Sequence, residues 1–262
     1  MTKGIITIAT PDYLESAKLL ALTAKKFSNL PTTLITTDPV EASEFDNIIV
    51  VPGDVTNAFA VGLLSSPYDY TAFIYADSLV LSDIKEYFNL LDKVNLVTPD
   101  AYDFKGQKLD SQKFIERKIL TKNTMPDVWT NFFLYRTEAI KEISNTTLDI
   151  IAVWQNVLKM SCTEYSVDTE LKNKINSAFA IALKACGLNN NAHGVKFTNL
   201  SKQTNNTALT HLANKDWHQL LSFWATDDNL VKIENYVQSG VVHYGSTWLN
   251  SPRSNSIKQI CN

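Results

Sequence analysis

The first hundred residues alternate short apolar runs with longer segments in which apolar residues recur every three or four positions. Such runs, rich in β-branched and aromatic residues, predict strands at 4–10, 32–37, 48–51, 71–75 and 95–98. Two segments with the helical period, 11–27 and 82–92, lie between them. Because parallel strands are joined through helical crossovers, this alternation predicts an α/β protein with a mainly parallel sheet flanked by helices.

The pattern is less regular beyond residue 100. A strand that passes into a helix is predicted at 129–143, and two further helices at about 147–160 and 168–186. Another helix is predicted at 211–225, whereas 230–245 predicts two strands. These elements extend the α/β pattern without a clean repeat of it.

Composition sets bounds on the kind of protein. With 262 residues, 45% of them hydrophobic, and no Pro/Gly/Ser-rich linker, we expect one domain over 1–262. The 24 Lys and Arg against 27 Asp and Glu give a net charge of -3, which does not indicate a general nucleic-acid binder. No apolar run approaches the roughly 18 residues of a spanning helix, and no signal-peptide pattern is present, so we expect a cytoplasmic protein without a membrane span.

The cysteine spacing and the lack of nucleotide-binding motifs disfavour several kinds of site. Three widely spaced cysteines argue against a disulfide framework and against a zinc cluster. The chain has no G-x-G-x-x-G after its first strand and no Walker loop, which disfavours dinucleotide-binding and P-loop enzymes.

A single carboxylate follows the strand predicted at 71–75. Asp77, in "FIYADSLVL", lies just beyond this strand, and ligands of α/β proteins bind at the carboxyl ends of strands. Its alternative role is to cap the turn before 82–92. From 27 to 84 there is no Lys or Arg but eight Asp and Glu, so a phosphate bound there needs a cation, or basic residues from the second half.

Four segments carry a resemblance to a known family: "GIITIATPDYLESAKLLALTAKKF", "SPYDYTAFIYADSLVL", "WTNFFLYRTEAIKEI" and "GVVHYGSTWL". In order and spacing they resemble GT-A-fold, nucleotide-sugar-dependent glycosyltransferases, in particular the glycogenin-like family 8 and its relatives in phage genomes. The resemblance implies a Rossmann-like mixed sheet flanked by helices, with a nucleotide-sugar-binding half (1–100) and an acceptor half (101–262). It also implies a hexosyl- or pentosyltransferase with a UDP-sugar as the expected donor and a hydroxyl acceptor, in the host cytoplasm if phage-encoded.

The family motifs imply a metal site. In this family an Asp-x-Asp motif ends the strand, and a His-x-Gly near the C-terminus supplies another ligand to Mn²⁺ or Mg²⁺, which bridges the donor phosphates. Asp77 and His243 match these motifs, whereas Tyr75 stands where the first Asp would be. With two protein ligands, water and phosphate oxygens must complete six-coordination, so we expect weak metal binding without nucleotide. By itself, His243 could equally be an ordinary half-buried histidine.

Nucleotide contacts are implied at the ends of the first two strands. The family places a polar turn and an aromatic ring against the base, at the positions of Thr10, Asp12 and Tyr13. The alternative is helix capping, by Thr10 or by an Asp12–Glu15 capping box. Asp38 would meet the base or ribose, or else begin a turn.

Sugar contacts are implied in the second half. Residues 129–131 correspond to a sugar-contacting turn of the family, in which Asn131 is the preferred polar contact. Asp168, with Glu164 nearby, stands where the family carries an Asp-containing donor-sugar motif; the alternative for Asp168 is a helix N-cap. Asn131 and Asp168 are therefore the candidate catalytic residues.

Basic residues of the second half are candidates for phosphate binding. Arg253 or Lys258 could offset the missing cations of the first half. The segment 105–122 is rich in Lys and Arg; it is either a solvated face or a surface for a phosphate-bearing acceptor, DNA included. The hypotheses are a metal-dependent transferase acting on a saccharide or small molecule, a transferase acting on a DNA base, and an inactive relative that only binds.

Overall fold

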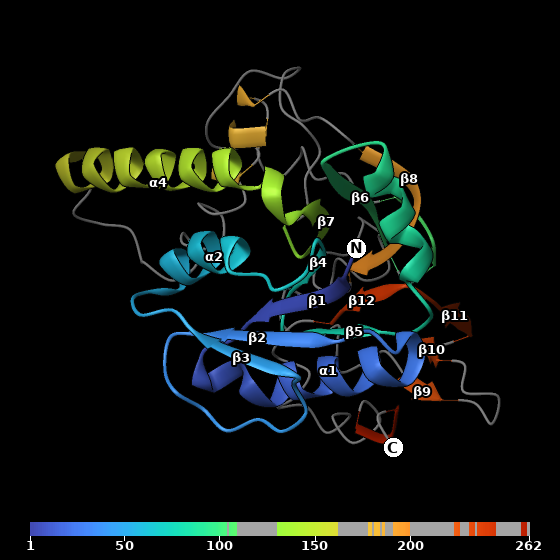
Figure 1. Cartoon of the computed structure of the whole chain (residues 1–262). Coiled ribbons are helices and arrows are strands. Elements are labelled where there is room, and N and C mark those ends of the chain that lie inside the picture. The colour runs from blue at the N-terminus through green and yellow to red at the C-terminus, as the bar shows by residue number, and fades with distance from the viewer. Residues whose placement is uncertain are drawn as a thin grey trace.

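The computed structural model describes residues 1–103, 105–108, 130–161, 178–179, 181–183, 185–186, 191–199, 223–225, 231–233, 235–244 and 258–260. Within this part the chain forms an α/β fold in which a large mixed sheet is flanked by helices (Figure 1). This confirms the predicted α/β class with a mixed sheet flanked by helices. None of the helices described is both long and apolar enough to cross a membrane.

The large sheet contains nine strands. They are β1 (Lys3–Ile8), β2 (Thr32–Thr36), β3 (Asn47–Val50), β4 (Tyr70–Ile74), β5 (Ser78–Val80), β6 (Leu96–Tyr102), β7 (Phe132–Arg136), β8 (Asn191–Asn199) and β12 (Val241–His243). A second sheet consists of β9 (Phe223–Ala225), β10 (Val231–Ile233) and β11 (Tyr236–Gln238). The helices bounded within the described part are α1 (Leu14–Ser28), α2 (Val55–Leu64) and α4 (Lys141–Ser161), with short 3₁₀ helices η1 (Pro11–Tyr13), η2 (Lys85–Asp92) and η3 (Thr137–Ala139); described residues within 178–185 and at 258–260 are also helical.

Strands from both halves of the chain share the large sheet, whose order is β3-β2-β1-β4-β7-β6-β8-β12-β5. The first four run parallel, and β7 enters antiparallel between β4 and β6. At the other end β12 runs parallel to β8 and antiparallel to β5. The strand that directly follows β4 in sequence is therefore held by the C-terminal strand β12.

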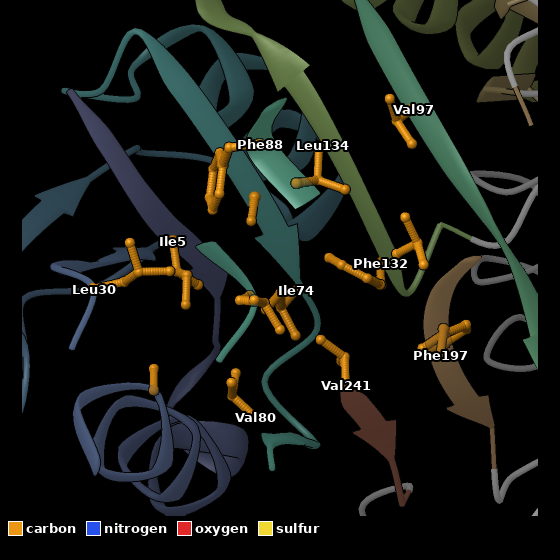
Figure 2. Close-up of a cluster of buried hydrophobic side chains, with 14 of the residues drawn as sticks. Ile5, Leu30, Ile74, Val80, Phe88, Val97, Phe132, Leu134, Phe197 and Val241 are labelled. Atoms are coloured by element: carbon orange, nitrogen blue, oxygen red, sulfur yellow. The ribbon is translucent and has the colours of Figure 1, made fainter. Parts of the chain in front are cut away.

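Alternate residues of the central strands face two different cores. One core joins Ile5 of β1, Phe132 and Leu134 of β7 and residues of α1 and η2; Figure 2 shows how strands distant in sequence contribute to it. The other core contains the intervening residues Ile6 and Phe133, with side chains from α2 and α4. Each face of the sheet is thus covered by helices, which explains why these strands are apolar throughout.

Several predicted elements differ in detail from the structure. Of the helix predicted at 82–92, only Lys85–Asp92 is helical, as the 3₁₀ helix η2, in which residues three apart align; its buried residues Phe88 and Leu91 have that spacing. Three strands, not two, lie between 231 and 243, because a turn at Gly240 (φ 74°) separates β11 from β12. The helix predicted at about 147–160 begins earlier, at Lys141.

Other differences concern segments that the pattern did not identify. No element was expected at 55–64, 78–80 or 191–199, which form α2, β5 and β8. Of the helix predicted at 211–225, residues 211–222 lie outside the described part, and 223–225 form strand β9, so the prediction is wrong there. Three-residue strands such as β9 are too short to leave a period in the sequence.

Gly4 in β1 allows Tyr68 to pack directly against the strand. A Cβ at position 4 would overlap the Tyr68 ring, whose hydroxyl is hydrogen-bonded to Thr33 Oγ1 at 2.8 Å. We expect Gly4→Ala to lower the free energy of unfolding by about 1–3 kcal/mol, the usual cost of overpacking, measured by urea denaturation. Gly4→Ala combined with Tyr68→Ala removes the overlap, so the double variant should lose less than the sum of the single changes. Additive losses would contradict this explanation.

Candidate functional site

Four chain segments meet beyond the carboxyl end of β4. Asp77 follows β4, and its carbonyl accepts a hydrogen bond from Tyr244 N at 3.0 Å, at the end of β12. Because β7 is antiparallel to β4, the N-terminal end of β7 lies beside the carboxyl end of β4, where Tyr75 N donates a hydrogen bond to Asn131 O at 2.9 Å. The β5–β12 register places His243 opposite Ser78. Backbone hydrogen bonds therefore bring these residues together.

The side chains of Asp77 and His243 contact each other in the interior of this junction. Asp77 Oδ1 lies 3.2 Å from His243 Nδ1, and the two residues are only 3% and 4% exposed. Ser78 Oγ lies 3.3 Å from the same Nδ1, and Asn131 Nδ2 lies 3.1 Å from Nε2 on the far side of the ring. The structure thus brings together three of the residues selected from the sequence, whereas their chemical roles stay predictions.

Tyr75 forms one wall of this site. Its ring meets the His243 ring edge to face, with centroids 6.2 Å apart and planes at 77°, and meets Phe73 in the same manner. Its hydroxyl and Thr130 Oγ1 are hydrogen-bonded at 3.2 Å. Burial raises the pKa of Tyr75 to about 12; the Thr130 hydrogen bond opposes this rise, and the charge of Asp77 adds to it. Tyr75 therefore contributes a neutral hydroxyl that is hydrogen-bonded to Thr130.

Tyr75→Phe should flatten the loss of stability at high pH. The folded pKa, about 12, exceeds the unfolded value of about 10, so the contribution of Tyr75 is complete below pH 10 and is lost as pH rises toward 12. Urea denaturation at about pH 9 and about pH 11 should show a smaller difference for the variant than for the unmodified protein. Tyr236→Phe, at an exposed position, is the control. An unchanged pH dependence in Tyr75→Phe would contradict the assignment.

The Asp77–His243 pair has the donor chemistry and spacing for a divalent ion. An octahedral ion with bonds of about 2.1 Å holds adjacent ligand atoms about 3.0 Å apart. The 3.2 Å between Oδ1 and Nδ1 fits that spacing as well as it fits a hydrogen bond. Among the residues that the structure describes, no group of three or more His, Cys, Asp or Glu side chains could hold a metal. A divalent ion here would therefore depend on oxygens from a ligand.

The predicted nucleotide contacts lie near the ends of β1 and β2. Tyr13 packs partly buried in a cluster with Ala9 and Ala76, the residue before Asp77, so it lies beside the site. Thr10 O accepts a hydrogen bond from Tyr13 N at 2.9 Å, and the Thr10 side chain caps no helix. Asp12 is exposed. The structure thus gives Tyr13 the closest link to Asp77 among these three residues.

No side chain caps the start of η1 or α1, where Thr10 and Asp12 were the capping alternatives. Helix α1 begins after Tyr13 without a side-chain cap, and Glu15 instead pairs with Lys18 Nζ at 3.0 Å, so the Asp12–Glu15 capping box is not formed. Asp38, exposed after β2, accepts a hydrogen bond from Thr37 Oγ1 at 2.8 Å. This contact fits the alternative in which Asp38 organises a turn.

Several predicted residues lie outside the described part of the chain. They are Trp129, Glu164, Asp168, Gly245, Arg253 and most of the basic segment, residues 109–122. Lys258 is described and exposed on the last short helix. In the described portion of the basic segment, Lys108 Nζ lies 2.8 Å from Asp100 Oδ1, so this lysine neutralises a buried carboxylate of β6.

Sequence reasoning missed Ser78 and Asp100, and it identified Thr130 only as part of the sugar-contacting turn at 129–131. Ser78 and Thr130 contribute hydroxyls to His243 and Tyr75. Ser78 directly follows Asp77, and that adjacency was the available signal. Asp100 could have been found by the logic applied to Asp77, since it lies near the carboxyl end of a predicted strand.

A surface depression of about 620 Å³ lies at the opposite edge of the sheet. Asn95 before β6, Glu138 after β7 and Lys141 of α4 line it, together with Cys186. Its lining does not include the Asp77–His243 pair, and the carboxyl end of β4 is at the other edge. We therefore assign the candidate site to the Asp77 junction from its chemistry.

Comparison with known proteins does not assign the chain to a family. No protein-family model matches the chain, and no curated protein matches it significantly.

Proposed function

We propose that this protein is a metal-dependent glycosyltransferase of the GT-A type. It would move a sugar from a nucleotide-diphosphate donor to an acceptor hydroxyl of a saccharide or small molecule, and a UDP-sugar is the expected donor. The observation that carries the proposal is the buried contact between Asp77 and His243 at the carboxyl end of β4. Carboxyl ends of parallel strands are where α/β folds bind their ligands.

Charge supports a role for a divalent ion. Residues 27–84 contain no Lys or Arg, and among the described residues a carboxylate, a hydroxyl and an amide contact the nitrogens of His243. Asp77 and His243 would hold Mn²⁺ or Mg²⁺, which when bound supplies charge neutralisation for the departing nucleoside diphosphate. The same pair lies in a buried setting, where water is largely excluded and electrostatic interactions are stronger than in solvent.

The other residues have supporting roles in this proposal. Tyr13 offers an aromatic face for the base beside Ala76, and the hydrogen bond between Tyr75 and Thr130 holds the wall next to His243. The half-buried Asn131 lies where β7 begins, and it contacts both Tyr75 and His243. These fixed groups would orient the donor rather than react with it.

A single carboxylate makes the binding of the ion depend on the nucleotide. One Asp cancels half of the charge of a divalent ion, so the ion on the protein alone keeps a net positive charge and few ligands. The phosphates of a bound nucleotide would neutralise the remaining positive charge and supply the missing oxygen ligands. Ion and nucleotide should therefore bind cooperatively, each raising the affinity for the other by the same factor.

The test is a thermal-shift screen of nucleoside diphosphates and their sugars, with and without Mn²⁺. We expect UDP or a UDP-sugar to raise Tm by several degrees with Mn²⁺ and by much less without it, because a ligand that binds the folded state stabilises it by mass action. Mn²⁺ alone should shift Tm little. If no nucleotide raises Tm with Mn²⁺ at millimolar concentration, the proposed function is wrong.

A second candidate, a nucleotide-binding protein without transfer activity, is favoured by one observation. Tyr75 occupies the place of a second carboxylate, and its hydroxyl is engaged by Thr130. Both candidates predict the same Tm shifts. Release of UDP from a panel of UDP-sugars, followed with a coupled assay, separates them: the transferase releases UDP slowly even to water, and the binding protein does not. The DNA-base alternative depends on the basic segment 105–122, of which residues 109–122 lie outside the described part of the chain.

A further inference from the structure

The two ends of the large sheet differ in how they are protected. At one end is β5, whose Val80 N donates a hydrogen bond to Thr23 Oγ1 of α1 at 3.2 Å. At the other end is β3, and within the described part of the chain no strand pairs with its outer side. Proteins usually protect such an edge with Lys, Pro, a bulge or a covering element. The β3 sequence, Asn-Ile-Ile-Val, contains neither Lys nor Pro.

The backbone groups on the outer side of β3 belong to Ile48 and Val50. Val51 N donates to Thr36 O at 2.8 Å, and the parallel register pairs Thr36 with Val50. Because successive residues of a strand direct their N–H and C=O groups to opposite sides, Ile49 and Val51 face β2, whereas Ile48 and Val50 face away from it. These two residues are also 37% and 42% exposed. The edge thus offers two donors, two acceptors and two apolar side chains to a further strand.

Acidic residues flank β3 on both sides, and the segment 27–84 around it contains no Lys or Arg. Consider antiparallel pairing of β3 with β3 of a second copy, in which Ile48 of one copy lies opposite Val50 of the other. This register would bring Glu44 of each copy level with Asp54 of the other, and like charges opposite each other destabilise paired strands. The charge pattern therefore disfavours self-pairing and favours a strand that carries basic residues. The acids nearest β3 are Glu44, Asp46 and Asp54.

We propose that β3 is a docking edge for an extended, positively charged segment of a partner protein, which adds to the large sheet as a further strand. The backbone of Ile48 and Val50 supplies the main-chain hydrogen bonds that give strand addition its affinity. Basic residues at the ends of the partner strand meet the flanking acids, so charge selects the partner. The inference does not depend on the proposed function, because β3 lies three strands away from β4 and the Asp77 junction.

A fluorescent peptide tests the edge on the unmodified full chain. The Lys peptide has alternating Thr and Val between two terminal lysines, and the matched Glu peptide has glutamates in their place. We expect saturable binding of the Lys peptide by fluorescence anisotropy, and binding of the Glu peptide that is weaker by at least about 10-fold. Methylation of the backbone nitrogens of its Thr and Val residues removes main-chain donors without changing charge, and should abolish binding. No binding of the Lys peptide, or equal binding of the methylated form, would overturn the inference.

Variants of the edge separate backbone pairing from charge. Val50→Pro removes an N–H that faces away from β2, and should weaken binding of the Lys peptide by at least about 10-fold. Val50→Thr keeps this N–H and a β-branched side chain, so it should bind as the unmodified protein does. Asp46→Asn combined with Asp54→Asn keeps acceptors for the hydrogen bonds from Thr32 N and Asn57 N, and should weaken binding by about 3- to 10-fold.

Amide hydrogen exchange locates the bound peptide on the unmodified chain. The amides of Ile48 and Val50 should exchange rapidly in the free protein and become protected with the Lys peptide, whereas that of Ile49, which faces β2, should be protected in both states. Unchanged exchange at Ile48 and Val50, or full affinity in a folded Val50→Pro, would overturn the inference. A dimer in sedimentation that Val50→Pro dissociates would assign the edge to a second copy, and would overturn it too.

Discussion

Asp77→Asn should abolish the dependence of UDP binding on Mn²⁺, weakening binding in its presence by at least about 100-fold, more than the loss of an outer-shell hydrogen bond. The amide is nearly isosteric with the carboxylate and keeps an acceptor for His243 Nδ1, so the fold should tolerate it. What it removes is the negative charge of the pair. Calorimetric titration of UDP with and without Mn²⁺ measures the effect.

A matched control uses another carboxylate of the same region. Asp83 is exposed after β5, where its Oδ1 accepts a hydrogen bond from Lys85 N at 2.9 Å. Asp83→Asn carries the same charge change and should leave Mn²⁺-dependent binding unaltered. If both variants bind UDP with Mn²⁺ as tightly as the unmodified protein, Asp77 is not a ligand and the metal proposal is wrong.

Phe133→Ala should produce the largest loss of stability, about 3–5 kcal/mol. Phe133 is fully buried in β7, and its ring packs 4.9 Å from the rings of both Phe73 and Phe179. The substitution loses the transfer free energy of the ring and leaves a cavity between sheet and helices. Because domains of ordinary stability have about 5–15 kcal/mol in total, urea denaturation should show a strongly lowered midpoint.

An exposed apolar residue provides the comparison. Val237 in β11 is 52% exposed, and Val237→Ala should change the free energy of unfolding by about 0.5 kcal/mol or less. Similar losses for Phe133→Ala and Val237→Ala would mean that the aromatic cluster around β7 does not stabilise the protein as its burial indicates.

The sequence by itself determined the elements whose period is long or whose apolar character is unbroken. The buried runs of β1, β2 and β4 and the amphipathic α1 were visible because each side chain reports the local environment that it will occupy. Position relative to a strand end was also visible, which is why Asp77 was selected. That logic needs only neighbouring residues.

Only the tertiary structure decided which distant residues meet. The three-residue strand β5 has no recognisable period, and the strands predicted at 230–245 did not reveal their partners, yet the β5–β12 pairing sets His243 opposite Ser78 and beside Asp77. The antiparallel entry of β7 likewise brings Asn131 to Nε2 of His243. Sheet pairing is a contact between segments far apart in sequence, and its register depends on the packing of the whole core. Local propensity therefore could not specify the contacts of His243 on which the proposed chemistry depends.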